Sequence, residues 1–339
     1  MWNILPINRR LSTSFFKLEW HLALKFRGDV GLACSISVGP ANSAYREWLG
    51  SRVGMSIYEM KADPQDLVAP ALVVSFEDWV DAGGAGSAAA RHIADGGDLI
   101  ATFDADAIFD YRSHRPVLDI VDGAPTRMEL PRMTLTRRRL RERDLFVLTG
   151  PEPDYRWKEF AAGVREVALR LGVLEHVSLG AIPAAVPHTA PTPVMMTASS
   201  KELMRGAPSN EGLLRVPAAA VSLIEWTLAE SGIPAVGFWA QVPHYAVPYI
   251  SGAIALIRRV ESHLSITIGA GALEDQEKAQ RAELQRVFAA NPEAKGYLER
   301  LENIVGEQEV PPTEHIAEEV ERFLRNYRRG EGGPTPFSP

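Results

Sequence analysis

A regular alternation of short apolar runs with helix-like segments, which begins at residue 70, most constrains the fold of this chain. Apolar runs of strand length occur at 71–76, 98–104, 144–150, 175–182 and 233–241. Segments with apolar residues at helical spacing follow them, at 86–97, 153–172, 216–232 and 248–264. Strands that alternate with helices predict an α/β fold, with a mixed, mostly parallel central sheet flanked by helices.

Two of these helices carry signals for their first residues. Asp154 is a plausible N-cap of the helix at 153–172, because its side chain could accept a hydrogen bond from the first turn. Pro217 is expected at the first position of the helix at 216–232, where its missing N–H is not needed. That second helix is apolar on nearly every face, so we expect it to be buried.

Further segments at 115–121 and 127–138 alternate as strands at a sheet edge do. A basic run, RRRLRER, follows at 137–143. Such a run could bind an acidic partner, but it is more typical of a solvated hairpin tip, which is the interpretation that we favour.

The chain divides into parts of different character. The first 54 residues lack hydrophobic periodicity and carry seven Lys and Arg against three Asp and Glu, although the whole chain has a net charge of −7. Charged helices are predicted at 272–290 and 293–306, and a third after Pro312. The predicted organisation is an N-terminal extension at 1–54 (disordered, or a mis-called start), an α/β core at 55–270, a helical region at 271–328 and a disordered tail at 329–339.

Composition excludes several classes of protein. A net-acidic core argues against binding to nucleic acid or to an anionic membrane surface. Cys34 is the only cysteine, which excludes a disulfide framework and fits a cytoplasmic protein. No apolar run approaches the ~20 residues of a membrane helix. The sequence lacks a Walker A motif, a G-x-S-x-G elbow and an H-E-x-x-H motif, so we expect no cofactor and no metal.

The stretch SFEDWVDAGGAG at 75–86 places Glu77, Asp78, Trp79 and Asp81 between a strand and a glycine cluster. A phosphate cradle, a Mg²⁺ site and a structural turn would each use some of these residues. The acids would repel a pyrophosphate at the following helix start. Acids there more often cap the helix, so we favour the structural interpretation, with Asp81 as the cap and Trp79 packed over the sheet end.

Ligands of parallel sheets gather beyond the carboxyl ends of the strands. The residues at these predicted ends form a candidate cleft for a ligand or a partner: Glu77, Asp78, Trp79, Asp81, Glu152, Asp154, His188, Trp239, His244 and Tyr245. A histidine, a carboxylate and a tyrosine in one cleft could serve acid–base catalysis. An isolated loop histidine more often packs and hydrogen-bonds structurally, so no catalytic residue is assigned.

Five blocks of the sequence, in order, resemble those of the PAC2 (proteasome assembly chaperone 2) family, and most of all its bacterial members found beside actinobacterial-type proteasomes. The blocks are VVSFEDWVDAGGAG at 73–86, DYRSHRPVLDI at 110–120, GPEPDYRWKEF at 150–160, PAAVPHTAPTPV at 183–194 and FWAQVPHYAV at 238–247. The resemblance implies a fold similar to nucleoside phosphorylases. It also implies a scaffold that binds proteasome α-subunits and is not an enzyme.

The chain departs from the family pattern at three places. Asp78 stands where the family often has glycine, and Ala190 stands where arginine is expected. The sequence ends Phe337-Ser338-Pro339, without the penultimate tyrosine with which some assembly factors dock into α-ring pockets. We therefore do not expect docking of that kind.

Two functions stay open at this point. The first is a non-catalytic binding protein that self-associates and is linked to proteasome assembly. The alternative is a phosphorylase-like or hydrolase-like enzyme, or the ATP-grasp ligase whose label some bacterial members carry, with the strand-end acids and histidines at its centre. The lack of a coherent set of nucleophile, base and anion-binding group favours the first.

Overall fold

The structure is a computed structural model, and it describes residues 56–204 and 212–307. The predicted extension at 1–54, the third C-terminal helix and the tail at 329–339 lie outside the described residues.

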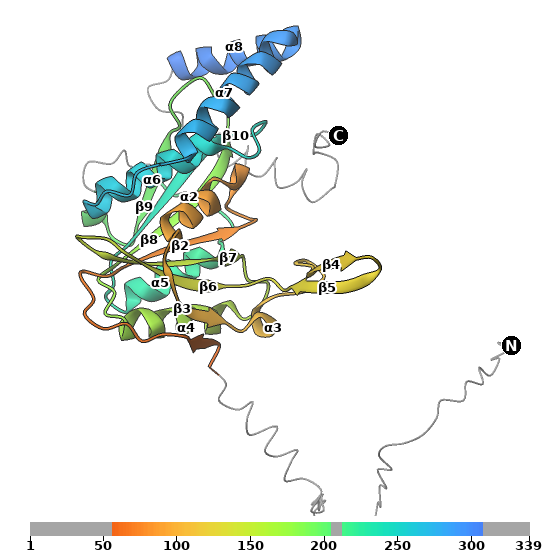
Figure 1. Ribbon diagram of the computed structural model, residues 1–339. Helices are drawn as coiled ribbons and strands as arrows, with labels where there is room; N and C mark the ends of the chain where they lie inside the picture. Colours follow the sequence, from red (N-terminus) through yellow and green to blue (C-terminus); the bar gives the residue numbers. More distant parts are fainter. Residues whose placement is uncertain (1–55, 205–211, 308–339) are drawn as a thin grey trace, which may run out of the picture. The chain divides into compact units, whose positions relative to one another are not determined.

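A sheet of eight strands forms the centre, in the order β1-β3-β6-β7-β2-β8-β10-β9 (Figure 1). Its strands are β1 (Tyr58–Met60), β2 (Ala71–Glu77), β3 (Asp98–Phe103), β6 (Thr134–Arg139), β7 (Asp144–Pro151), β8 (Glu175–Ala184), β9 (Val194–Ala198) and β10 (Ala235–Pro243). The four central strands, β7, β2, β8 and β10, are parallel, and the pairings outside them are antiparallel. The predicted mixed sheet flanked by helices is confirmed, with its parallel part confined to the centre.

Helices cover both faces of this sheet. Figure 1 shows α4 (Trp157–Arg170) and α5 (Ala220–Glu230) on one face, and α2 (Ala85–Ala94) and α6 (Ile250–Leu264) on the other. Successive side chains of a strand point to opposite faces. In β2, Leu72, Val74 and Phe76 therefore pack on the α4 side, whereas Ala71 and Val73 pack on the α2 side. Burial on both faces explains why this strand reads as a continuous apolar run.

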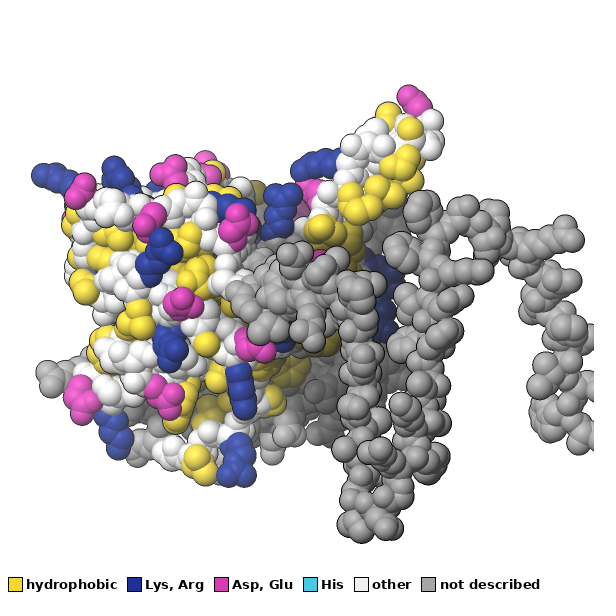
Figure 2. Space-filling view, turned by 90° about the horizontal axis from the view of Figure 1, so that it is seen from below, with side chains coloured by type: hydrophobic (Ala, Val, Ile, Leu, Met, Phe, Trp, Pro, Cys, Tyr) yellow, Lys and Arg dark blue, Asp and Glu magenta, His cyan; other side chains and the backbone are white. Residues whose placement is uncertain are grey.

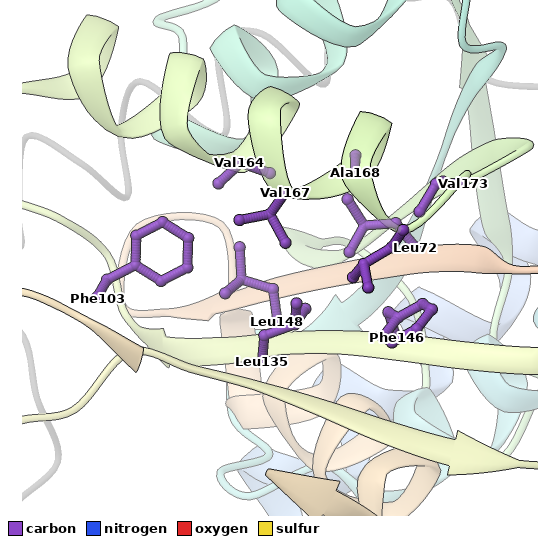
Figure 3. A pocket seen from close by; sticks show the side chains of 10 residues that line it. Leu72, Phe103, Leu135, Phe146, Leu148, Val164, Val167, Ala168 and Val173 are labelled. Atoms are coloured by element: carbon purple, nitrogen blue, oxygen red, sulfur yellow. The ribbon is translucent and has the colours of Figure 1, made fainter. Parts of the chain in front are cut away.

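The core beneath α4 is tightly filled. In Figure 3, Val164 and Val167 point from the helix toward Leu148 on the sheet. A space of about 10 Å³ lies among these side chains, and it is lined by apolar residues alone. A void of that size does not exceed what one water molecule needs. It is a packing defect of the core and not a ligand site.

A second sheet contains only β4 (Val117–Val121) and β5 (Ala124–Glu129). The sequence interpretation expected edge strands here, but this hairpin projects from the central sheet instead (Figure 1). All residues of both strands are exposed, including Val117 at 58%, Ile120 at 60% and Met128 at 60%. The hairpin thus presents apolar side chains that no other described element covers.

The remaining helices are α3 (Ala105–Ile108), α7 (Leu273–Ala290) and α8 (Pro292–Glu307), with short 3₁₀ turns η2 (Ala82–Gly84) and η3 (Lys201–Met204). The predicted helices at 272–290 and 293–306 correspond to α7 and α8. Phe288 of α7 and Leu301 of α8 are buried, and α7 contacts α6. None of the helices in the described part of the chain combines the length and the apolar character of a membrane span.

The structure corrects two predicted helix starts. Helix α4 begins at Trp157, after Arg156 in a left-handed conformation, and Asp154 does not cap it. Helix α5 begins at Ala220, three residues after Pro217, and residues 213–219 are not helical. The carboxylate of Glu152 accepts a hydrogen bond from the N–H of Ala220 and so fixes the start of the helix there. The helix is also not buried on every face, since Trp226 is 67% exposed.

The basic run at 137–143 is only partly a solvated hairpin tip. Arg137 is 5% exposed, and its Nε lies 2.7 Å from Oδ1 of the buried Asp144. Arg138 donates to the carbonyl of His92 at the end of α2, and Arg143 pairs with Glu175 of β8. The hairpin of β6 and β7, which contains this run, lies against α2 and the loop before β2. These arginines therefore bind backbone and carboxylate oxygens instead of water.

Candidate functional site

A cavity of about 850 Å³ lies beyond the carboxyl ends of β2 and β7. Its walls come from the loop after β2, the loop after β7, the end of β8, one face of β9 and the segment that leads into α5. Most of its charged side chains are acidic, and three of its aromatic side chains are tryptophans. The parallel centre of the sheet therefore places its cavity where parallel sheets usually bind ligands.

Six of the ten predicted cleft residues line this cavity: Asp78, Trp79, Asp81, Glu152, Asp154 and Trp239. The other four, Glu77, His188, His244 and Tyr245, do not. Glu77 points to the other side and forms an ion pair with Arg91 of α2, with 2.7 Å between the charged atoms. The predicted union of acids and histidines in one cleft is therefore not found.

His188 and Tyr245 form a separate cluster against α7. His188 is 1% exposed, and its Nδ1 lies 3.0 Å from the hydroxyl of Tyr245. That hydroxyl also accepts a hydrogen bond from the backbone N–H of His188. The ring of Phe288 lies 5.1 Å from His188 and 4.7 Å from Tyr245, and His244 packs on Tyr297 of α8. Burial lowers the pKa of His188 and raises the pKa of Tyr245 to about 12. These properties suit a structural role.

Asp81 binds the start of α2. Its Oδ1 accepts hydrogen bonds from the N–H groups of Gly86, at 2.6 Å, and Ser87, at 3.1 Å. Burial nevertheless raises the pKa of this carboxyl group. Gly86 is required here, because a Cβ at that position would lie 2.9 Å from the hydroxyl of Ser75 and 3.0 Å from Cα of Gly180. The glycine cluster thus allows close helix–sheet packing, as the structural interpretation expects.

Glu152 acts in the same way on the other face of the sheet. Its Oε1 accepts a hydrogen bond of 2.6 Å from the N–H of Ala220, the first residue of α5. Burial raises the pKa of Glu152, and the charges of Asp78 and Asp154 add to that effect. Two of the cavity's carboxylates are therefore engaged by helix N-termini.

His114 is a site residue that the sequence interpretation missed. It lies between two carboxylates, with Nε2 3.0 Å from Asp78 and Nδ1 2.9 Å from Asp154. Burial lowers the pKa of His114, but the hydrogen bonds and charges of Asp78 and Asp154 outweigh it and raise the pKa above the ordinary value. Its position inside the resembling block 110–120 was the only signal that could have pointed to it.

Glu225 is the second missed residue. It lies on α5 among apolar neighbours, and burial raises its pKa to about 7 despite a hydrogen bond with Ser178. Its Oε1 is buried and has no hydrogen-bond partner among the described residues. A single acid in an otherwise apolar helical run is the available signal, but the apolar run itself predicts a buried helix.

The tryptophans of the cavity are firmly held. Trp239 occupies the space above Gly180 and Gly237, where an added Cβ would lie 2.6 Å and 2.8 Å from its ring. Its indole N–H donates to Thr197, at 2.9 Å, and that of Trp157 donates to the carbonyl of Pro153, at 2.6 Å. Trp79 is partly buried against the core beneath α4 and α5.

The described lining of the cavity contains no lysine and no arginine. A phosphate group would therefore meet carboxylates without a compensating cation other than His114. The described residues also contain no group of three or more His, Cys, Asp and Glu side chains placed to hold a metal ion. The arrangement is suited to an uncharged or cationic ligand.

These features define an α/β protein with a strand-end binding cavity and a projecting apolar hairpin. A family model described as "PAC2 family" matches residues 75–288, and the chain belongs to that family. The comparison with curated proteins found no match.

Solved structures agree with this assignment. A proteasome-assembly chaperone homologue from Mycobacterium tuberculosis is 34% identical, with a TM-score of 0.62, over 67% of this chain and 99% of that chain. A PAC2 family protein from Streptomyces avermitilis is 30% identical, with a TM-score of 0.61, over 68% and 99%. A second M. tuberculosis protein, of unknown function, is 28% identical, with a TM-score of 0.70, over 82% and 92%.

Proposed function

We propose that this PAC2 protein is a non-catalytic binding protein that self-associates and contacts proteasome α-subunits during their assembly in the cytoplasm. Its likeness to the mycobacterial proteasome-assembly chaperone homologue, which the match covers almost completely, supports the proteasome as the client. The single cysteine fits a reducing compartment.

The projecting hairpin is the observation that carries this proposal. Val117 and Leu118 are adjacent in β4, and so are Ile120 and Val121, so both faces of the hairpin present apolar side chains. A two-stranded sheet is marginally stable by itself in water, and clustered exposed apolar side chains mark interaction sites. A second copy offers the same apolar surface, so two hairpins are complementary without any charge. The hairpin is therefore the self-association element.

The surface elsewhere fits a protein partner better than nucleic acid. Figure 2 shows one face on which Lys and Arg side chains are interspersed with Asp and Glu, and apolar side chains lie between them. Positive charge does not gather there into a patch among the described residues. A nucleic-acid-binding face would need such a patch.

Size-exclusion chromatography with light scattering tests both parts of the proposal. The chain alone should have twice the mass of one chain or more. Val117→Lys combined with Ile120→Lys should reduce it to one chain, whereas Leu169→Lys, at an exposed position of α4, should not. With purified proteasome α-subunits, the unchanged chain should co-elute. A monomeric chain would overturn self-association, and a lack of co-elution would overturn the client.

The enzyme alternative draws on the polar cavity. A hydrolase-like reaction could use the imidazole of His114 between its two carboxylates. A phosphorylase-like reaction or an ATP-dependent ligase is less compatible, because the described lining offers no lysine or arginine to a phosphate. Turnover of a nucleoside or amide substrate by the purified protein, lost in His114→Gln, would favour the enzyme over the scaffold.

A further inference from the structure

The strand-end cavity has the dimensions of a small-molecule site. Its volume of about 850 Å³ falls within the range of about 300–1,000 Å³ that ligand pockets occupy. Segments far apart in the sequence converge on it, from Asp78 to Trp239. The likeness to a proteasome-assembly chaperone homologue does not explain why the cavity should be open.

Two carboxylates of the cavity are not used by helix N-termini or loop N–H groups. Asp81 binds α2 and Glu152 binds α5, while Asp154 accepts from the N–H of Asp110, at 2.7 Å, as well as from His114. Among the described residues, the side chain of Asp78 forms a hydrogen bond only with His114, and it is 55% exposed. Glu225 has the unpartnered Oε1. Asp78 therefore has acceptor capacity left for a ligand, whereas Oε1 of Glu225 is enclosed by protein atoms and this carboxyl group acts on a ligand through its charge.

The charge of the cavity selects the ligand's sign. His114 is the only basic side chain in the described lining, and it is already shared between Asp78 and Asp154. An anion would be repelled by the remaining carboxylates, whereas a cation would be attracted. Glu225 borders the same space, so its carboxylate adds to the attraction of a cation.

The tryptophans favour a ligand that packs against aromatic rings. The indole N–H groups of Trp157 and Trp239 are used within the protein, so these residues offer their rings and not their donors. Indole is the side chain that binds cations best through its π face. Trp239 is fixed by the glycines beneath it, which keeps the loss of side-chain entropy on binding small.

We propose that this cavity binds a small organic cation, an amine or alkylated ammonium with an apolar body, between the rings of Trp79, Trp157 and Trp239 and the carboxylates of Asp78 and Glu225.

Isothermal titration of the full-length protein tests the site. Choline and agmatine serve as cationic probes, the neutral carbon isostere of choline as the uncharged probe, and inorganic phosphate as the anion. At least one cation should bind with a Kd of about 1 mM or lower and about tenfold more tightly than the neutral isostere. Glu225→Gln and Asp78→Asn should each weaken that binding about tenfold, and Trp239→Leu should weaken it similarly.

Matched controls lie on the exposed side of α5. Glu230→Gln and Trp226→Leu should leave the affinity unchanged, because neither residue lines the cavity. Thermal melts of all variants show whether they are folded, and the exposed Asp78→Asn carries the test if Trp239→Leu does not fold. Equal affinity for the neutral isostere, tighter binding of phosphate, or binding only of a lysine-containing peptide and of neither free cation would overturn the proposal.

Discussion

The imidazole Nε2 of His114 lies 3.0 Å from the carboxylate of Asp78, a residue whose backbone φ is +82°. Residues other than glycine rarely adopt a positive φ, because their Cβ atom then comes too close to the following carbonyl oxygen. The ion pair and the strained backbone therefore occur at the same residue. An aspartate at this position therefore carries a backbone strain that glycine would not.

The strain at Asp78 can be separated from its ion pair by two substitutions. Asp78→Gly and Asp78→Ala both remove the carboxylate, but only alanine keeps a Cβ at the positive φ. We expect the glycine variant to be more stable by about 0.5–1 kcal/mol in urea unfolding, after the greater flexibility of unfolded glycine is included. At Asp106, in the first turn of α3, the order should be reversed. An alanine variant of position 78 that equals the glycine variant would contradict the strain.

His114 should stabilise the protein mainly at acidic pH. Its pKa is raised in the folded state, so the stabilisation is fully present below the unfolded value of about 6.5 and is lost as pH rises through the folded value. His114→Gln should therefore lower the melting temperature more at about pH 5.5 than at about pH 8.5. His92→Gln, which alters a contact with the Gly269 carbonyl, is the control. The same loss at both pH values would refute the charged bridge.

Glu225 should destabilise the protein at neutral and alkaline pH. Its pKa of about 7 in the folded state exceeds the ordinary 4.5, so the folded state binds the proton more tightly and stability falls as pH rises from 4.5 to 7. Glu225→Gln removes this effect. At about pH 8, the free energy of unfolding of this variant, measured in urea, should therefore exceed that of the unchanged chain by at most about 3 kcal/mol. The difference should shrink toward pH 4.5, and Glu230→Gln should show no such trend.

The buried pair of Arg137 and Asp144 should contribute strongly to folding. Asp144 also accepts a hydrogen bond of 2.7 Å from the N–H of Val68. Loss of its carboxylate would therefore leave both the Arg137 side chain and this backbone N–H without that acceptor. We expect Asp144→Ala to lower the free energy of unfolding by about 3–5 kcal/mol. Arg139→Ala, in the same basic run, should change it by less than about 0.5 kcal/mol. If both substitutions changed the free energy of unfolding by similarly small amounts, the basic run would be a solvated hairpin tip after all.

Much of the fold could be predicted from hydrophobic periodicity. The apolar runs at 71–76 and 144–150 are buried on both faces of the sheet, and that burial produces an unbroken apolar sequence. The alternating segments at 115–121 and 127–138 gave no sign that β4 and β5 leave the central sheet, because period two reports pairing but not the partner. The predicted helix starts at Asp154 and Pro217 were wrong, because contacts with distant loops override the local sequence signals there.

The site was predictable only in part, because its members are joined by contacts across long sequence separations. Strand-end position identified Asp78, Asp81 and Glu152, since the carboxyl ends of parallel strands share one edge. His114 precedes the hairpin and is brought in by carboxylates 36 and 40 residues away. His188 and His244 also follow parallel strands, but α7 and α8 cover that part of the edge with Phe288 and Tyr297.

The placement of the tryptophans has an optical consequence. Of the four tryptophans in the described residues, Trp79, Trp157 and Trp239 line the cavity, and only Trp226 lies outside it. A chain that begins at Met55 and carries Trp226→Phe keeps no other indole. Under excitation selective for indole, its ultraviolet emission would come from the cavity walls alone. The protein therefore carries a built-in fluorophore set whose colour and intensity report, without any added dye, on what enters that space.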